Sequence, residues 1–155
     1  MPIHVEVVSQ ERKLFEEPAA DMVIIPGSEG VLGVLPHHTP LITTMNYGEL
    51  IIRKGAAEEY FAIYGGVVEV RPDKVVVLAD AADFADAINL REMEEARERI
   101  KKVMAEGVPP EDQEFVAHEL KRAELAINLS RKTQSRAGQI RIRVVDSDKG
   151  SKKEE

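Results

Sequence analysis

Short runs of β-branched and aromatic residues recur along the first half of the chain, separated by turn clusters rich in glycine, proline and aspartate. Such runs at close spacing indicate antiparallel strands. The runs cover residues 4–8, 22–25, 31–35, 41–45, 50–53, 60–64, 67–70 and 75–79. At least eight short strands with no helical stretch between them predict a small β-sandwich or barrel.

The hydrophobic pattern changes after Asp80. Apolar residues then recur every three or four positions, which is the period of an amphipathic helix. The first helical stripe contains Met93, Ala96, Ile100, Val103 and Met104, and the second contains Val116, Leu120, Ala123 and Ile127. Gly107 and the prolines after it should end the first helix, and Asp112 should cap a second helix that ends near Lys132. Because both stripes are narrow, we expect each helix to pack against the other and against little else.

These patterns predict three parts. Residues 1–86 form an all-β sandwich, residues 87–135 form an α-helical antiparallel hairpin, and residues 136–155 form a polar tail that is largely disordered. Within the tail, residues 139–145 alternate like a strand, and the last eight or so residues are expected to be disordered.

Composition excludes several classes of function. The 155 residues contain no cysteine, so a disulfide framework, a thiolate metal site and a cysteine nucleophile are all excluded. Aromatic residues make up 5% of the chain, and residues 1–86 carry 6 Lys/Arg against 14 Asp/Glu. This argues against nucleic acid as a partner, because binding a phosphate backbone needs clustered cations. No apolar run is long enough for a membrane span or a signal peptide, so no direct membrane insertion is expected.

A search for reactive side chains gives no catalytic constellation. No serine lies in a Gly-x-Ser-x-Gly turn, and the glycines of residues 27–33 lack the Gly-Lys-Ser/Thr of a phosphate loop. His37 and His38 are adjacent and point in different directions, so we expect ring contacts with backbone rather than a metal site. The carboxylate pairs at 16–17 and 58–59 are expected to be solvated. We therefore predict no catalytic residue, no metal and no cofactor.

Three segments, in this order, carry a resemblance to a known family: residues 25–41 (IPGSEGVLGVLPHHTPL), residues 65–82 (GGVVEVRPDKVVVLADAA) and residues 121–126 (KRAELA). With the predicted architecture they cover about residues 1–133, and they resemble the epsilon subunit of the F-type ATP synthase, which is called delta in mitochondria. The resemblance implies a sandwich of about ten strands docked on the gamma subunit and the c-ring, followed by the hairpin.

The resemblance also implies the function. Such a protein is not an enzyme itself: it belongs to the central stalk, the rotor that couples proton flow to ATP synthesis. Its C-terminal helices can extend along gamma into the catalytic alpha/beta head and hinder ATP hydrolysis. Because no transit peptide precedes the sandwich, we expect a bacterial protein, peripheral on the cytoplasmic side of the cell membrane.

The resemblance suggests candidate contact residues. Those near gamma are Leu35, Pro36, His37, His38 and Met45. The basic residues Lys121, Arg122, Arg131 and Lys132 could meet acidic loops of the catalytic head, or could simply form a solvated helix face.

Some members of the family bind ATP through an Ile/Leu-Asp-x-x-Arg-Ala motif. Here Glu94 replaces the Asp, Arg97 keeps the Arg, and Glu98 replaces the Ala. An acid beside a polyphosphate is unfavourable, so we predict weak or no ATP binding. Two other hypotheses remain open at this point: a free-standing small-molecule-binding β-sandwich with a helical oligomerisation hairpin, and an enzyme with an unrecognised site.

Overall fold

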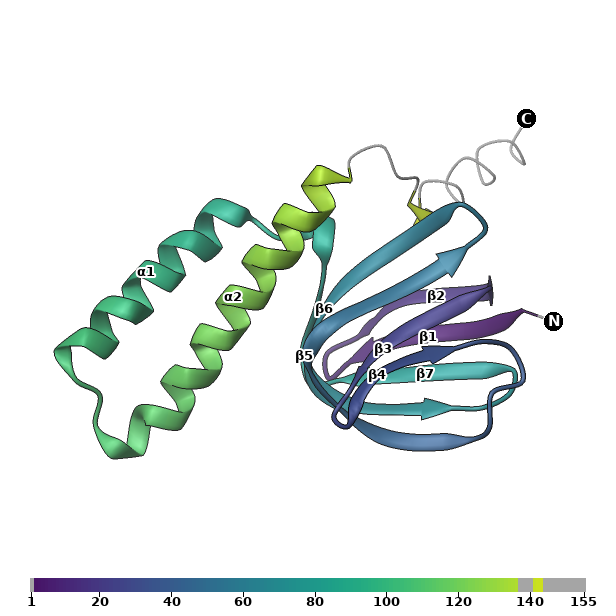
Figure 1. Cartoon of the computed structure of the whole chain (residues 1–155), viewed down its shortest axis with the longest axis horizontal. Coiled ribbons are helices and arrows are strands. Elements are labelled where there is room, and N and C mark those ends of the chain that lie inside the picture. Colours follow the sequence, from purple (N-terminus) through teal and green to yellow (C-terminus); the bar gives the residue numbers. More distant parts are fainter. Residues whose placement is uncertain (1, 137–140, 144–155) are drawn as a thin grey trace.

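The computed structural model describes residues 2–136 and 141–143 and places a β-sandwich beside a pair of antiparallel helices (Figure 1). The strands are β1 (Ile3–Ser9), β2 (Lys13–Ala20), β3 (Met22–Gly27), β4 (Gly30–Val34), β5 (Leu41–Lys54), β6 (Ala57–Val70), β7 (Lys74–Ala79) and β8 (Ala82–Phe84). The helices are the 3₁₀ turn η1 (Ala85–Ala87), α1 (Leu90–Glu106), the 3₁₀ turn η2 (Pro110–Asp112) and α2 (Gln113–Ser135). The predicted order of a sandwich followed by a helical hairpin is confirmed.

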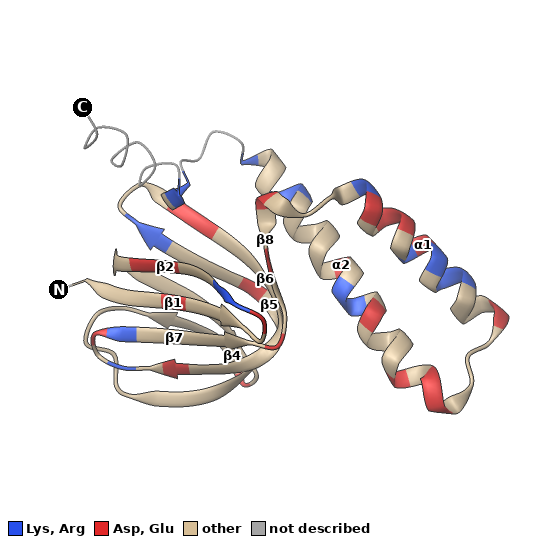
Figure 2. Cartoon of the chain, turned by 180° about the vertical axis from the view of Figure 1, so that it is seen from behind, with Lys and Arg blue, Asp and Glu red and all other residues tan. Residues whose placement is uncertain are grey.

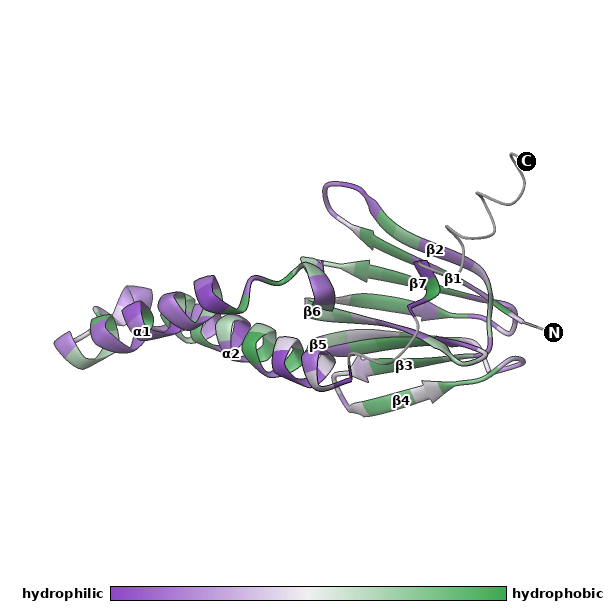
Figure 3. Cartoon of the chain, turned by 90° about the horizontal axis from the view of Figure 1, so that it is seen from above, coloured by the Kyte–Doolittle hydropathy of each residue, from purple (hydrophilic) through white to green (hydrophobic). Residues whose placement is uncertain are grey.

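The strands form one continuous hydrogen-bonded sheet that folds over itself. Its order is β2-β1-β7-β6-β5-β3-β4, with β8 paired to β6, and β1 and β7 are the parallel neighbours. Seen from above, the strands separate into two layers with the core between them (Figure 3). Alternate residues of β1 point inward, where Ile3, Val5 and Val7 are fully buried.

The structure has eight strands among the described residues, whereas the resemblance implied about ten. Runs that the sequence separates, 41–45 with 50–53 and 60–64 with 67–70, are the two halves of the 14-residue strands β5 and β6. The glycine pair Gly65-Gly66, which the pattern predicts as a turn between the runs 60–64 and 67–70, therefore lies within β6, and that prediction is wrong. These glycines have φ angles of 82° and 133°, which lets β6 bend without ending.

Two strands escaped prediction. β2 contains Pro18 and the adjacent acids Glu16 and Glu17, which interrupt the apolar pattern. Its pairing with β1 nevertheless places Phe15 and Glu17 inside the sandwich. β8 has three residues, too few to show an alternation.

The helices begin and end close to the predicted residues. Asn89 caps α1 by accepting a hydrogen bond from the Glu92 amide at 3.2 Å, and Gly107 ends it with a φ of 102°. Asp112 precedes α2, as predicted, although its side chain makes no capping hydrogen bond. No helix among the described residues is long and apolar enough to span a membrane.

The expectation that the hairpin packs only against itself is wrong. α1 has no buried residue and packs on α2. α2 packs on the sandwich as well, and its buried residues are Ala123, Ala126, Ile127, Leu129 and Ser130. Figures 1 and 3 show α2 between α1 and the sandwich, with the far end of the hairpin projecting away.

The described part of the tail also differs from the prediction. Ile142 and Arg143 are helical rather than extended, and Ile142 is fully buried in the core of the sandwich. The remainder of the predicted strand and the predicted disorder at the C-terminus lie outside the described residues.

Candidate functional site

The residues with unusual surroundings gather where α2 meets the sandwich. Leu129 of α2 is fully buried against Ile51, Tyr60 and Tyr64 of β5 and β6, and Ala85 of η1 completes this cluster. Burial of a leucine side chain contributes about 1.5–3 kcal/mol to packing. We call this contact between α2 and strands β5 and β6 the joint.

Polar contacts surround the apolar centre of the joint. The guanidinium of Arg122 lies 4.4 Å from the centre of the Tyr64 ring, within the range of a cation–π interaction. Lys132 Nζ lies 2.8 Å from Glu49 Oε2. Arg122 lies near the middle of α2 and Lys132 in its last turn, and both join the helix to the middle of the long strands.

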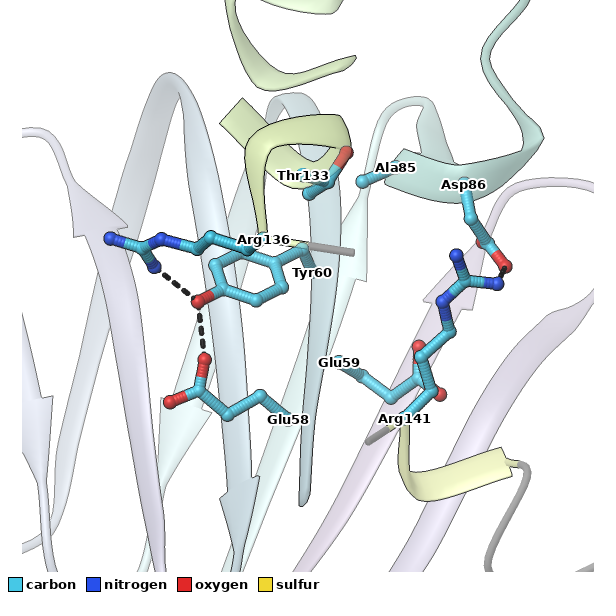
Figure 4. A pocket seen from close by; sticks show the side chains of 8 residues that line it. All are labelled: Glu58, Glu59, Tyr60, Ala85, Asp86, Thr133, Arg136 and Arg141. Carbon is cyan, nitrogen blue, oxygen red and sulfur yellow. Dashed lines mark hydrogen bonds and ion pairs between the residues drawn. The ribbon is translucent and has the colours of Figure 1, made fainter. Parts of the chain in front are cut away.

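The end of α2 holds a second tyrosine. Arg136 Nη1 donates to the Tyr60 hydroxyl at 2.6 Å, and that hydroxyl donates to the Glu58 carboxylate, so the three side chains form a chain (Figure 4). Burial raises the pKa of Tyr60, and the Glu58 hydrogen bond raises it further, while Arg136 opposes both effects. The Tyr60 phenol therefore stays neutral at physiological pH and can donate its proton to Glu58.

Tyr64 is held in a similar way at the centre of the joint. Its hydroxyl donates to Asp83 Oδ2 at 3.0 Å. Burial raises the pKa of Tyr64 well above its ordinary value, and the charge of Asp83 adds to this effect against the opposing Arg122. These shifts follow from packing and do not by themselves indicate catalysis.

The cavity beside the joint is small. It is lined by Glu58, Glu59, Tyr60, Ala85, Asp86, Thr133, Arg136 and Arg141 (Figure 4). Its volume of about 40 Å³ admits a few water molecules, whereas sites for drug-sized ligands occupy about 300–1,000 Å³. Its arginines are engaged by neighbouring groups, such as Arg141 with Asp86 at 2.7 Å. This cavity does not favour the hypothesis of a small-molecule-binding sandwich.

Three of the four predicted basic contact residues bind other side chains of this chain. Arg122 lies over Tyr64, Lys132 pairs with Glu49, and Arg131 Nη2 lies 2.7 Å from Glu94 Oε1 across the hairpin. Lys121 is exposed. In this conformation Arg122, Arg131 and Lys132 therefore hold the hairpin together and fasten it to the sandwich.

The residues that correspond to the ATP motif lie on α1. Glu94 is engaged by Arg131, while Arg97 Nε lies 3.9 Å from Glu98 Oε1 and, among the described residues, has no hydrogen-bond partner. Charged residues of both signs occur along α1 (Figure 2). The acids at 94 and 98 thus flank Arg97, the position that a polyphosphate would approach.

The predicted gamma contacts are only partly accessible. Leu35 is 56% exposed, Pro36 and His38 are half-buried, and His37 is exposed with a φ of 69°. His38 Nδ1 contacts the Thr39 carbonyl oxygen at 2.7 Å, which confirms the predicted ring contact with backbone. Met45 is 5% exposed and belongs to the core, so its prediction as a partner contact is wrong. It faces inward because Leu41, Thr43 and Met45 alternate along β5 with the exposed residues Ile42 and Thr44.

Two carboxylates that were expected to be solvated are buried. Glu17 Oε1 lies 2.7 Å from Lys54 Nζ, and Glu59 Oε1 accepts hydrogen bonds from the backbone and side chain of Arg143 at 2.9 and 3.1 Å. Each is the inward member of an adjacent pair on a strand. Successive residues of a strand point to opposite faces of the sheet, so one acid of each pair points into the sandwich. This alternation could have revealed the two buried acids from the sequence.

One surface cluster has the composition of a metal site. Ligand atoms of His4, Glu6 and Glu16 lie within 4.8 Å of one another. The Lys13 ammonium hydrogen-bonds Glu16 and lies 3.5 Å from Glu6, and it lowers the pKa of Glu16. A cation of the chain therefore already occupies the position between these acids.

The geometry defines a class of protein: a β-sandwich with a helical hairpin docked on one side. Its polar side chains at the joint hold the hairpin to the sandwich. Residues 2–85 match the model of the family "ATP synthase, Delta/Epsilon chain, beta-sandwich domain". The ATP synthase epsilon chain of Dehalococcoides mccartyi is 42% identical over 108 residues, which are 70% of this chain and 76% of that protein. The epsilon chain of Herpetosiphon aurantiacus is 37% identical over 136 residues, 88% of this chain and 99% of that protein.

Solved structures share the fold. A chain of the Euglena gracilis mitochondrial ATP synthase, in a structure of OSCP/F1/c-ring, superposes with a TM-score of 0.63 at 20% identity, covering 88% of this chain and 81% of that one. A chain of the Tetrahymena thermophila mitochondrial ATP synthase central stalk/c-ring gives a TM-score of 0.56 at 12% identity, covering 86% and 96%. The chain belongs to the ATP synthase delta/epsilon family and is an ATP synthase subunit.

Proposed function

We propose that this chain is the epsilon subunit in the central stalk of a bacterial F-type ATP synthase, where it couples proton flow to ATP synthesis and limits ATP hydrolysis through its hairpin. It has no catalytic site of its own in this proposal. Support comes from the relatives named ATP synthase epsilon chain and from the fold shared with chains of F1/c-ring and central stalk assemblies. Its place is peripheral, on the cytoplasmic side of the cell membrane.

The observation that carries the inhibitory role is the one-sided attachment of the hairpin. α1 has no buried residue, and the buried residues of α2 all lie from Ala123 onward. The far end carries the exposed apolar residues Val103, Met104 and Phe115, the last of which is 67% exposed. Elements with few buried contacts open at a small cost in free energy, so the hairpin can exchange the joint for another apolar partner.

Contacts with gamma and the c-ring would use the sandwich. Val31, Leu35, Ile42, Val67 and Leu78 are large apolar residues exposed on its strands and loops. Val67 and Leu78 are cross-strand partners, so they form one patch on β6 and β7. Exposed apolar patches mark protein interfaces, and these residues replace Met45 as candidates.

The test is ATP hydrolysis by the assembled complex. Truncation after Asp86 removes the hairpin and should raise hydrolysis while the sandwich still co-purifies with gamma and the c-ring. Because truncation also uncovers Tyr60 and Tyr64, we add the full-length variant Phe115→Ser, which changes an exposed side chain at the far end and should also raise hydrolysis. If both assembled complexes hydrolyse ATP at the unmodified rate under low proton-motive force, the inhibitory role is wrong.

A further inference from the structure

The segment 141–143 lies past the end of α2 and returns to the sandwich. Ile142 has no exposed surface and belongs to the same core cluster as Phe15, Phe61 and Ile3. Figure 1 shows this short piece beside the β5–β6 end of the sandwich. A fully buried isoleucine anchors a segment far more firmly than surface charges do.

The arginines on either side of Ile142 bind acids from two different parts of the fold. Arg143 donates from its backbone and Nε to Glu59 of β6, at 2.9 and 3.1 Å. Its Nη2 lies 2.6 Å from Asp86 Oδ1, and Arg141 Nη1 lies 2.7 Å from Asp86 Oδ2. The Arg143 guanidinium also lies 3.9 Å from the centre of the Phe84 ring. Each carboxylate thus receives two hydrogen bonds from this segment.

Asp86 links these contacts to the start of the helical hairpin. Asp86 lies in η1, the connection through which the chain passes from β8 into α1. The other connection of the hairpin leads from Arg136 at the end of α2, and only four residues separate Arg136 from Arg141. The chain between these two arginines can span at most about 18 Å. This reach is about half the length of α2, which has 23 residues and is about 35 Å long. The C-terminal end of α2 therefore has to stay near the sandwich as long as residues 141–143 are bound there.

We propose that residues 141–143 form a latch that holds both connections of the hairpin to the sandwich and must leave it before the hairpin can extend. Ile142 supplies the anchor, and the pairing of Glu59 and Asp86 with the flanking arginines sets its position. The consequence for ATP hydrolysis rests on the proposed inhibitory function, whereas the latch itself is a property of the isolated chain.

The test is hydrogen exchange of the full-length protein and of three variants. Ile142→Ala removes the anchor, and the amides of residues 123–130 in α2 should then exchange about tenfold faster or more. Ile42→Ala is the matched control, because it makes the same change at an exposed isoleucine of β5 and should leave α2 protected. Amides of β1 and β7 report on the sandwich and should not change in either variant.

The pattern of exchange rates decides the proposal. Unchanged exchange of α2 in Ile142→Ala overturns the latch, and so does an equal increase in β1 and β7, since Ile142 would then be an ordinary core residue. Arg143→Gln keeps the anchor, and it should speed exchange of α2 by a smaller factor. Faster exchange of α2 supports the latch even if ATP hydrolysis by the complex is unchanged, and that last outcome counts against the inhibitory function alone.

Discussion

Lys132 Nζ in the last turns of α2 lies 2.8 Å from Glu49 Oε2 in the middle of β5, although the two residues are 83 positions apart in the sequence. This ion pair connects the hairpin to the sandwich at the edge of the joint. Both side chains are partly exposed, so water and salt screen the attraction. The apolar contact of Leu129 is therefore the larger contribution, and the pair sets the register of α2 on the strand.

A double-mutant cycle measures that pair. Lys132→Gln and Glu49→Gln should each weaken the docking of α2, and their coupling free energy should be about 0.3–1 kcal/mol at low salt and smaller at high salt. Denaturant unfolding gives the free energies. The pair of Arg91 and Glu95 on α1 is the control, because both side chains are largely exposed and both belong to the same helix. A coupling free energy that is the same at low and high salt would show that the contact is not electrostatic.

Substitution of Gly66 tests whether β6 needs a glycine where it bends. A Cβ atom there would lie 2.2 Å from the Leu78 carbonyl oxygen, at a φ of 133°. Gly30 has nearly the same φ, 136°, with no atom within 4 Å of an added Cβ. Gly30→Ala should cost about 1–2 kcal/mol for the backbone conformation alone, and Gly66→Ala about 1–3 kcal/mol more because of the clash. Equal losses in chemical denaturation would show that β7 moves aside freely.

The sequence predicts what depends on local pattern. Strand alternation, helical stripes, Gly107 as a helix end and Asp112 before α2 are local features, and the structure has them. Gly65 and Gly66 show the limit of this reasoning. Two adjacent glycines are as typical of a turn as of a bend within a strand, and only the pairing of Met45 with Gly66 and of Tyr47 with Tyr64 distinguishes the two.

The joint could not be predicted, because its contacts join residues distant in sequence. Lys132 and Arg131 look alike in the sequence, yet one meets β5 and the other meets α1. Ile142 alternates with arginines, which suggests a strand, and nothing local indicates that it enters the core of the sandwich. The resemblance suggested Arg131 and Lys132 as contact residues, and periodicity placed Ile142 in a strand, but the partners of all three depend on the tertiary arrangement.

The tyrosine at the centre of the joint predicts a dependence on alkaline pH. The pKa of Tyr64 is raised in the folded state, chiefly by burial, so folding favours the neutral phenol. Its contribution to stability is fully present below the unfolded-state pKa of about 10 and is lost as the pH rises above that value toward the folded-state pKa. Unfolding free energies measured across this range should fall with pH.

Tyr64→Phe isolates this effect. The variant should lose about 1 kcal/mol at neutral pH, because the Asp83 carboxylate loses its hydroxyl donor. Its stability should then fall less steeply above pH 10 than that of the unmodified chain. Parallel curves for the two proteins would show that Tyr64 does not carry the alkaline loss.

The last prediction concerns ATP. Glu98 lies 3.9 Å from Arg97, and Glu94 is engaged by Arg131, so acids flank the arginine that would meet a polyphosphate. Calorimetric titration of the full chain should therefore show weak or no binding of ATP, and micromolar binding would contradict this reading. Glu98→Ala removes one repulsive charge and should tighten binding about fivefold, equivalent to ~1 kcal/mol. Glu95→Ala, at the neighbouring exposed acid that pairs with Arg91, should change it less. Equal gains from both variants would show that only the overall charge of α1 matters, and that Arg97 is not the point of approach.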